Sequence, residues 1–127
     1  RGHFLGRVLW DDETQKDTGV PGEVKGKSSI RVLRAPIAGE FQTEYKIGHL
    51  VSENEIIGSV NGKAVIAPFE GCIRGLIKDG LLVEENEKIG DVDPRQDPEL
   101  TKYASEKSLA IAGGVLEAIL TYFKMVS

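Results

Sequence analysis

The chain has 127 residues, of which 40% are apolar and 28% are charged, and its formal net charge is −4. This size suits a single folded domain, and the slight negative charge argues against nucleic acid as the main partner, because phosphate binding requires a clustered basic surface. The single cysteine excludes an internal disulfide framework, and no uninterrupted apolar run reaches the length of a membrane span. We therefore expect a cytoplasmic protein with no signal peptide and no membrane partner.

The N-terminal 28 residues are predicted to form a strand and a loop. Residues 4–10 (FLGRVLW) have the β-branched and aromatic character of a short strand, and residues 11–18 are polar. Residues 19–23 (GVPGE) contain the glycines and proline of a tight turn. The first residue is Arg1 and the only methionine is Met125, so we expect the natural start of the protein to lie upstream. Residues 1–28 would then form the junction to that upstream region.

Residues 35–60 and 67–92 carry one pattern twice, at a shift of 32 residues and without a gap. Thirteen of the 26 aligned positions are identical, which indicates a duplicated unit. Two copies of such a unit can bury a shared core that neither could bury alone. We therefore expect residues 29–93 to form a closed β structure with pseudo-two-fold symmetry.

Strands are predicted at matching places in the two copies. One strand, residues 29–34, precedes the first copy. Residues 40–45 and 56–60 are strands of the first copy, and residues 72–77 and 88–92 are strands of the second. Each strand has apolar residues on one face, and proline or glycine marks its end. These strands would supply the two quasi-symmetric halves of the fold.

Turns are predicted where glycine and asparagine recur between the strands. The pairs Gly48/Gly80 and Asn54/Asn86 occupy the same position in both copies, where we expect backbone with positive φ. The dipeptide Asn61-Gly62 lies between two predicted strands and is a strong signal for a two-residue hairpin turn. This turn would join the two halves.

The last part of the chain, residues 94–127, is predicted to be a connector followed by one helix. Ser105 is a plausible N-cap for a helix over residues 106–126. Helical spacing places several apolar side chains on one face, namely Leu109, Ala112, Leu116, Ile119 and Phe123. Gly113 and Gly114 weaken the helix, so we expect its backbone to approach a sheet or another helix closely there.

Few polar residues have the spacing of a catalytic or metal-binding site. Cys72 is predicted to be packed and unreactive, because no helix N-terminus or basic partner is visible to lower its pKa. Two histidines and one cysteine give no recognisable metal-ligand spacing. Asp93 and Arg95 are predicted to form an ion pair that stabilises a turn. No nucleophile, base and orienting group occur together, so we expect no catalysis by this part of the protein.

The order AP-x-x-G, G-x-x-V and I-G-x-V resembles the lipoyl and biotinyl carrier domains. The resemblance implies a mainly β barrel-sandwich hybrid, the hammerhead fold, of two quasi-symmetric halves, with the C-terminal α-helix added here. In that family a lysine at the hairpin tip carries the cofactor, and Lys63 follows the predicted turn. However, the second AP-x-x-G lies closer to Lys63 than the family pattern requires, and no Met-Lys-Met motif is present. We expect an unmodified lysine, with modification of Lys63 as an alternative.

Six motifs in order resemble the C-terminal part of the YqeB-type accessory proteins of the selenium-dependent molybdenum hydroxylase system. They are RGHFLGR, TGVPGE, RVLRAP, the doubled AP-x-x-G, IGDVDPR and AIAGGVLEAIL. The resemblance implies a cytoplasmic bacterial or archaeal maturation factor with a further region before Arg1. Residues 11–17 (DDETQKD) depart from the family by being longer and more acidic, so partner contacts there can differ.

From this resemblance we expect a non-catalytic docking domain, whose partners are a molybdenum hydroxylase, its maturation proteins or the upstream half of the same polypeptide. No cofactor is expected in this part of the chain, beyond an indirect link to molybdopterin. Two alternatives remain open: a carrier modified at Lys63, and a cofactor-binding site around Arg1, His3, Asp93 and Arg95. Homo-oligomerisation is also left open.

Overall fold

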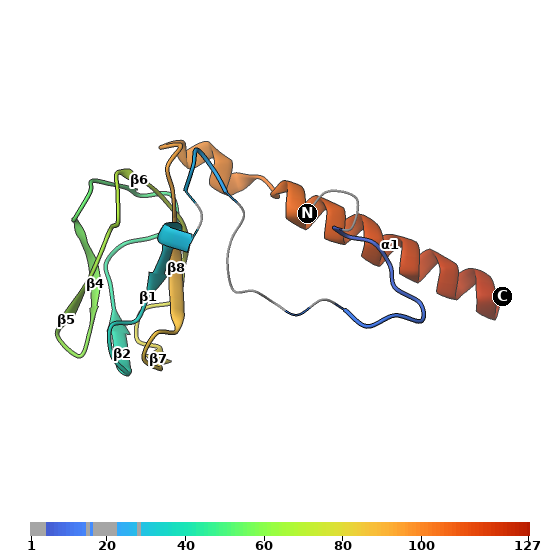
Figure 1. Cartoon of the computed structure of the whole chain (residues 1–127), viewed down its shortest axis with the longest axis horizontal. Helices are drawn as coiled ribbons and strands as arrows, with labels where there is room; N and C mark the ends of the chain where they lie inside the picture. Colours follow the sequence, from blue (N-terminus) through green and yellow to red (C-terminus); the bar gives the residue numbers. More distant parts are fainter. Residues whose placement is uncertain (1–4, 15, 17–22, 28) are drawn as a thin grey trace. The chain divides into compact units, whose positions relative to one another are not determined.

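The computed structural model describes residues 5–14, 16, 23–27 and 29–127. The chain forms two compact units, one of Gly19–Lys102 and one of Arg1–Thr18 with Tyr103–Ser127. The first unit is β structure, and the second contains the long helix α1 (Figure 1). The protein is therefore mainly β with one C-terminal helix, as the sequence predicted.

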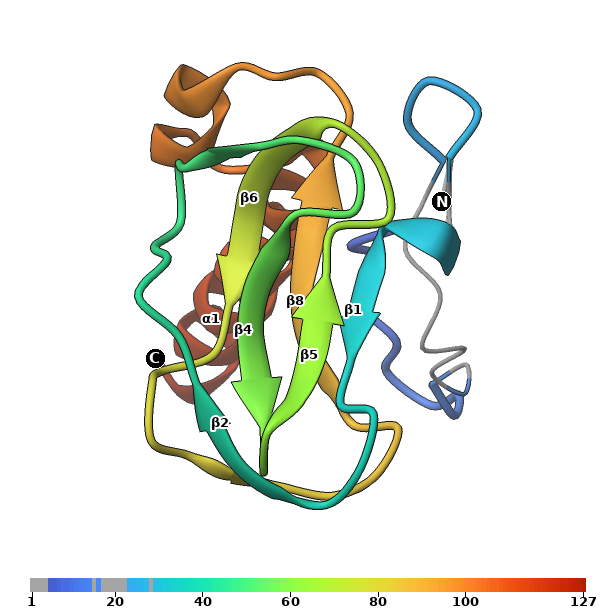
Figure 2. The same cartoon turned by 90° about the vertical axis from the view of Figure 1, so that its left-hand side faces the viewer.

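Two four-stranded antiparallel sheets make up the β unit. One has the order β1 (Val32–Arg34), β8 (Lys88–Asp93), β6 (Gly71–Leu76) and β3 (Leu50–Val51). The other has the order β5 (Lys63–Ile66), β4 (Ile56–Val60), β2 (Gly39–Gln42) and β7 (Leu82–Val83). Figure 2 shows β2, β4 and β5 in front of β1, β6 and β8. The expectation of a closed structure was wrong, because each sheet ends at two short edge strands that pair on one side only.

The duplication in the sequence relates one sheet to the other. A shift of 32 residues carries β1, β8, β6 and β3 onto β5, β4, β2 and β7, in the same order. Backbone bonds between the copies repeat as well: Asn54 N donates to Ala67 O and Asn86 N donates to Ala35 O, both at 2.9 Å. Each copy therefore completes the turns of the other.

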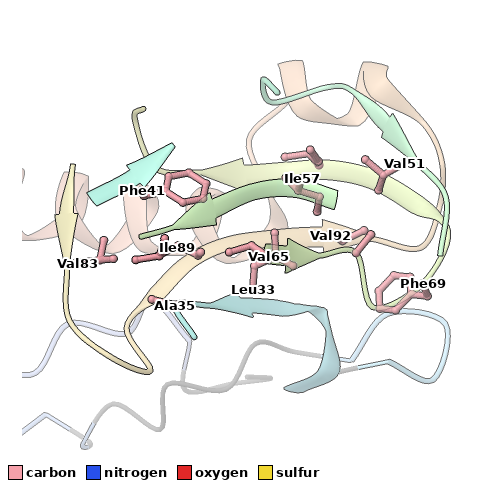
Figure 3. Close-up of a cluster of buried hydrophobic side chains, with 13 residues drawn as sticks. Leu33, Ala35, Phe41, Val51, Ile57, Val65, Phe69, Val83, Ile89 and Val92 are labelled. Atoms are coloured by element: carbon pink, nitrogen blue, oxygen red, sulfur yellow. The ribbon is translucent and has the colours of Figure 1, made fainter. Parts of the chain in front are cut away.

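The core between the sheets is built from matched positions of both copies. Phe41, Ile57, Ile73 and Ile89 are at most 1% exposed, and each lies at the position that its counterpart occupies in the other copy (Figure 3). Further matched pairs in the same buried cluster are Leu33/Val65, Ala35/Ala67, Val51/Val83 and Val60/Val92. Neither half has a core of its own, because the buried cluster contains matched side chains from both copies.

The turns confirm the predicted backbone conformations. Asn54 and Asn86 both have φ of 65°, and Gly48 and Gly80 have φ of 98° and 81°. In the link between the copies, Asn61 and Gly62 have φ of 46° and 79°, and Val60 pairs with Lys63. Positive φ at both central residues is the type I′ geometry, whose twist matches that of the flanking strands.

Three predicted strands differ from the structure, and one of them is residues 40–45, in which the strand ends at Gln42. Residues 29–34 begin with a 3₁₀ turn at Ser29–Arg31, and only Val32–Arg34 is strand, because the Arg31 side chain turns inward and bonds to β8. Residues 5–10, the described part of the predicted first strand, contain no strand. Gly6 has φ of 77° there, and its backbone packs against Ala110 of α1.

Helix α1 spans Glu106–Val126, and Ser105 is its N-cap, as predicted. The Ser105 Oγ accepts a hydrogen bond from Ser108 N at 3.1 Å. No residue of α1 is buried. Within the described residues, the stretch Pro98–Val126 has the length and apolar composition of a membrane-spanning helix, which the sequence reading did not anticipate. The same two properties also occur in helices of proteins outside membranes, so they leave the partner of α1 undecided.

The glycine pair of α1 divides into one constrained and one unconstrained position. A Cβ at Gly114 would overlap with Gly6 O, whereas a Cβ at Gly113 would have no neighbour within 4 Å. The predicted close approach is therefore confirmed for Gly114, but its neighbour is an irregular segment rather than a sheet or helix.

This difference predicts opposite effects of the same substitution. Gly113→Ala should stabilise α1 by about 0.5–1 kcal/mol through helix propensity. Gly114→Ala should displace the segment around Gly6 and raise hydrogen–deuterium exchange of the amides of residues 6–8. Equal exchange in the two variants would contradict the packing of Gly6 on Gly114.

Candidate functional site: an acidic groove and an arginine–aspartate cluster

A groove of about 480 Å³ lies along β2 and β4 in the β unit. Its described lining includes the carboxylates of Glu40, Glu44 and Asp79 and the side chain of Ile56, and it includes no lysine or arginine. Ile56 is 61% exposed. The groove thus combines an apolar contact with a rim of negative charge.

The groove exists because the first copy ends its strand early. β2 stops at Gln42, and the Thr43 hydroxyl donates to Ile57 O at 2.6 Å and accepts from Tyr45 N at 3.0 Å. In the second copy Gly75 replaces Thr43, and Ile77 N donates directly to Ile89 O at 2.9 Å. A side-chain hydroxyl inserted between the strands therefore holds the first copy open where the second copy continues its ladder.

Hydrogen bonds to carboxylates fix the walls of this groove. Thr43 N donates to Asp79 Oδ1 at 2.8 Å, and the Tyr45 hydroxyl donates to Glu55 Oε1 at 2.6 Å. The bond to Glu55 raises the pKa of Tyr45, since the carboxylate favours the protonated phenol. The pKa of Glu55 is lowered by a backbone hydrogen bond from Ser52 and by the bond from Tyr45. Glu55, which lies outside the groove lining, is therefore held in its ionised form beside Tyr45.

A cluster of arginine and aspartate side chains lies at the end of β8. Asp93, which is 3% exposed, accepts from Arg95 N at 3.0 Å, from Arg95 Nε at 2.9 Å and from Arg95 Nη2 at 2.6 Å. Arg31 Nη2 lies 3.0 Å from Asp91 Oδ1 and 3.9 Å from Asp93 Oδ2, and Arg74 Nη1 lies 3.7 Å from Asp93 Oδ2. The cluster joins the 3₁₀ turn before β1 to β6 and β8.

The two aspartates of this cluster respond differently to their surroundings. Burial raises the pKa of Asp93, but hydrogen bonds from the Arg95 side chain and backbone outweigh it, so the pKa is lowered overall. Burial also raises the pKa of Asp91, and there it exceeds the opposing attraction to Arg31. Asp93 is therefore the carboxylate whose charge the fold stabilises.

The predicted site residues lie in separate places or outside the described residues. Arg1 and His3 lie outside them, so a cofactor site that joins these two residues to Asp93 remains a prediction. Asp93 and Arg95 form the predicted ion pair, with both aspartate oxygens occupied by Arg95. Lys63 is the exposed first residue of β5, directly after the hairpin turn.

Cys72 is packed, as predicted. It is 1% exposed on β6, and burial, followed by the charge of Asp93, raises the pKa of its thiol. A raised thiol pKa lowers the thiolate fraction and hence the reactivity. Among the described residues, no group of three or more His, Cys, Asp and Glu side chains is arranged to hold a metal ion.

Sequence reasoning missed Arg31, Arg74 and the groove. Nothing in the local sequence marks Arg31 as buried, since it lies between Ile30 and Val32 in what looks like an alternating strand. One sequence difference could have indicated the groove. The two copies differ at the matched positions Thr43 and Gly75, and a threonine hydroxyl can form a hydrogen bond to the backbone, which glycine cannot.

Most of the chain is similar to a curated bacterial protein. No protein-family model matches the chain. The chain is 44% identical over 120 residues to a protein of Escherichia coli strain K12 described as "Uncharacterized protein YqeB", which supports the YqeB-type resemblance seen in the sequence. The match covers 94% of this chain but only 22% of the length of that relative.

One solved structure is similar over half of the chain. The crystal structure of an aspartoacylase family protein from Mesorhizobium loti matches with a TM-score of 0.46 and 17% identity, over 50% of this chain and 23% of that chain. A match at that level assigns neither fold nor function.

Proposed function

We propose that the Gly19–Lys102 unit is a non-catalytic docking domain of a YqeB-type protein, and that its acidic groove binds an extended segment of a partner protein carrying lysine or arginine and apolar side chains. One observation carries this proposal: Glu40, Glu44, Asp79 and the exposed Ile56 line the same groove, without a basic residue in the described lining. A basic, partly apolar segment complements both properties.

The energetics favour a transient complex. Ion pairs at an exposed rim contribute roughly 0–1 kcal/mol each, so charge sets orientation and association rate more than affinity. The apolar contact on Ile56 adds a term that salt does not screen. Binding should therefore weaken as salt rises, without vanishing.

We infer a barrel-sandwich hybrid of the carrier-domain kind, supported by the shift of 32 residues that maps one sheet onto the other and by the two-residue link at Asn61 and Gly62. A docking role for such a fold fits the maturation of selenium-dependent molybdenum hydroxylases in the cytoplasm. The partner would then be a hydroxylase or another maturation protein, and the link to molybdopterin would be indirect.

The groove proposal can be tested with a defined probe. A short peptide of alternating lysine and leucine is titrated against the protein by NMR, at low and at physiological salt. The double variant Glu40→Lys with Glu44→Lys should bind the peptide at least tenfold more weakly. The matched control, Glu53→Lys with Glu85→Lys, makes the same charge change at exposed positions outside the groove and should bind within twofold of the unaltered chain.

Two outcomes would overturn the groove as the docking site. One is equal weakening in both double variants, which would indicate net charge rather than the groove. The other is a set of chemical-shift changes that avoids β2 and β4. Capture of hydroxylase components by the unaltered protein, and not by the Glu40→Lys, Glu44→Lys variant, would support the maturation role.

A carrier function is the second candidate, and the position of Lys63 favours it. The lysine is exposed at the start of β5, beside the turn that joins the halves. Intact-mass spectrometry of the protein from its natural host decides the question: an adduct that Lys63→Arg removes would establish a carrier, and an unmodified mass would exclude one under those growth conditions.

A further inference from the structure

Helix α1 presents a continuous apolar seam. The seam consists of residues spaced alternately by three and four positions: Leu109, Ala112, Leu116, Ile119, Phe123 and Val126. This is the a/d spacing with which one helix packs against another in a coiled coil. All six residues are exposed, with exposed fractions between 46% and 63% for the five larger side chains. The seam therefore has the pattern of a helix–helix interface, and none of the described residues of this chain buries it.

The opposite side of α1 is already occupied. Gly6 packs against Ala110 and Gly114, and a shallow pocket between Val8 and Ala118 continues the contact. Ala110, Gly114 and Ala118 recur at four-residue spacing, which places them about half a turn away from the seam. The N-terminal segment thus covers the small residues of the helix and leaves the large apolar ones exposed.

We propose that α1 of one copy packs along α1 of a second copy in the antiparallel orientation. In that orientation the layers of the seam pair Leu109 with Val126, Ala112 with Phe123, and Leu116 with Ile119. Each layer then combines side chains of complementary size. A parallel pair would instead place Phe123 on Phe123 and Ala112 on Ala112, which overfills one layer and leaves a gap in another.

Charge complementarity points to the same orientation. Glu106 lies in the first turn of α1 and Lys124 in the last. An antiparallel pair brings the Glu106 end of one helix beside the Lys124 end of the other, and it places the positive end of each helix dipole beside the negative end of the other. A parallel pair would bring the two Lys124 side chains to the same end and would align the two helix dipoles in parallel, which is unfavourable.

The available area sets the expected strength. The seam and its apolar neighbours Val115, Leu120 and Tyr122 can bury on the order of 1,000 Å² between two copies. Stable interfaces bury about 1,200–2,000 Å². The dimer should therefore be weak and concentration-dependent, which distinguishes it from an obligate assembly.

Sedimentation equilibrium of the 127-residue chain over a range of concentrations tests the association. Leu116→Glu places a charge at the centre of the seam and should weaken dimerisation at least tenfold. Met125→Glu makes the same kind of change on the same helix but off the seam, and it should leave the dimerisation constant within threefold. A chain that stays monomeric throughout, or a dimer that Leu116→Glu does not weaken, would overturn the proposal.

Disulfide formation tests the orientation. A mixture of the Ala112→Cys and Phe123→Cys variants should form the mixed disulfide, because these positions share a layer in the antiparallel pair. Two identical positions would lie about 16 Å apart along the axis, at 1.5 Å per residue. Homodisulfides alone would overturn the antiparallel orientation. Cys72 is buried and does not interfere.

A membrane is the competing occupant of the seam. Flotation with vesicles of neutral phosphatidylcholine measures it directly. If the chain sediments as a monomer and floats with the vesicles, and if Leu116→Glu abolishes the flotation, the seam binds a lipid surface. That result would overturn the dimer. Dimerisation without flotation supports the proposal.

Discussion

Replacing Phe41 by alanine should lower the free energy of unfolding of the β unit by about 3–5 kcal/mol. Phe41 is fully buried between the two sheets, where it lies among side chains of both copies (Figure 3). Its removal leaves a cavity that the matched residue Ile73 cannot fill from the other sheet. A domain of this size is typically stable by only 5–15 kcal/mol, so the loss is a large share of the total.

Urea unfolding followed by circular dichroism measures this effect, and amide exchange in β4 and β8 assigns it to the β unit. Leu82→Ala is the control, because Leu82 is 81% exposed on an edge strand and should change stability by no more than about 0.5 kcal/mol. Similar losses in the two variants would mean that the core does not lie between the sheets. A loss confined to the first copy would mean that the copies do not share it.

Replacing Asp93 by asparagine should lower the free energy of unfolding by about 2–4 kcal/mol. The substitution removes the charge that Arg95 binds through its side chain and that Arg31 and Arg74 approach. Arg31 is 5% exposed, so its positive charge would remain in the protein with less compensation. The value lies below that of a fully buried pair, because Arg74 and Arg95 reach solvent.

Acid should remove the difference in unfolding free energy between the Asp93→Asn variant and the unaltered chain. The lowered pKa of Asp93 means that its contribution is complete above the ordinary carboxyl pKa of about 3.9 and disappears as pH falls through the folded-state pKa. Unfolding measured between pH 7 and pH 2 should show the Asp93→Asn variant and the unaltered chain converging at the acidic end. Asp93 therefore contributes to acid lability.

Asp91→Asn is the matched comparison two residues away. The raised pKa of Asp91 means that its ionised form is disfavoured in the fold, and this cost is present above the folded-state pKa and absent below the ordinary one. Removing the charge relieves that cost while losing the bond to Arg31, so the net loss should be less than half of that for Asp93→Asn. A larger loss at position 91 would reverse the assignment of the two roles.

The sequence by itself determined the elements whose causes are local or repeated. The positive φ of Asn54, Asn86 and Gly62 follows from residue type and position, and Ser105 caps its helix through its own hydroxyl. The shared core followed from the duplication, because half-identical copies must bury equivalent faces. The ion pair of Asp93 and Arg95 spans two residues and was accessible for the same reason.

The tertiary structure alone decided the features that depend on distant partners. Arg31 is buried because β8, about sixty residues later, offers it Val92 O and Asp91, and this contact turns the predicted strand into a 3₁₀ turn. Gly114 is constrained by Gly6, a contact between segments more than one hundred residues apart. The groove arises where the Thr43 hydroxyl meets Ile57 O across two strands. Such contacts have no local pattern, because the energy that fixes them is gained only when the separate segments meet.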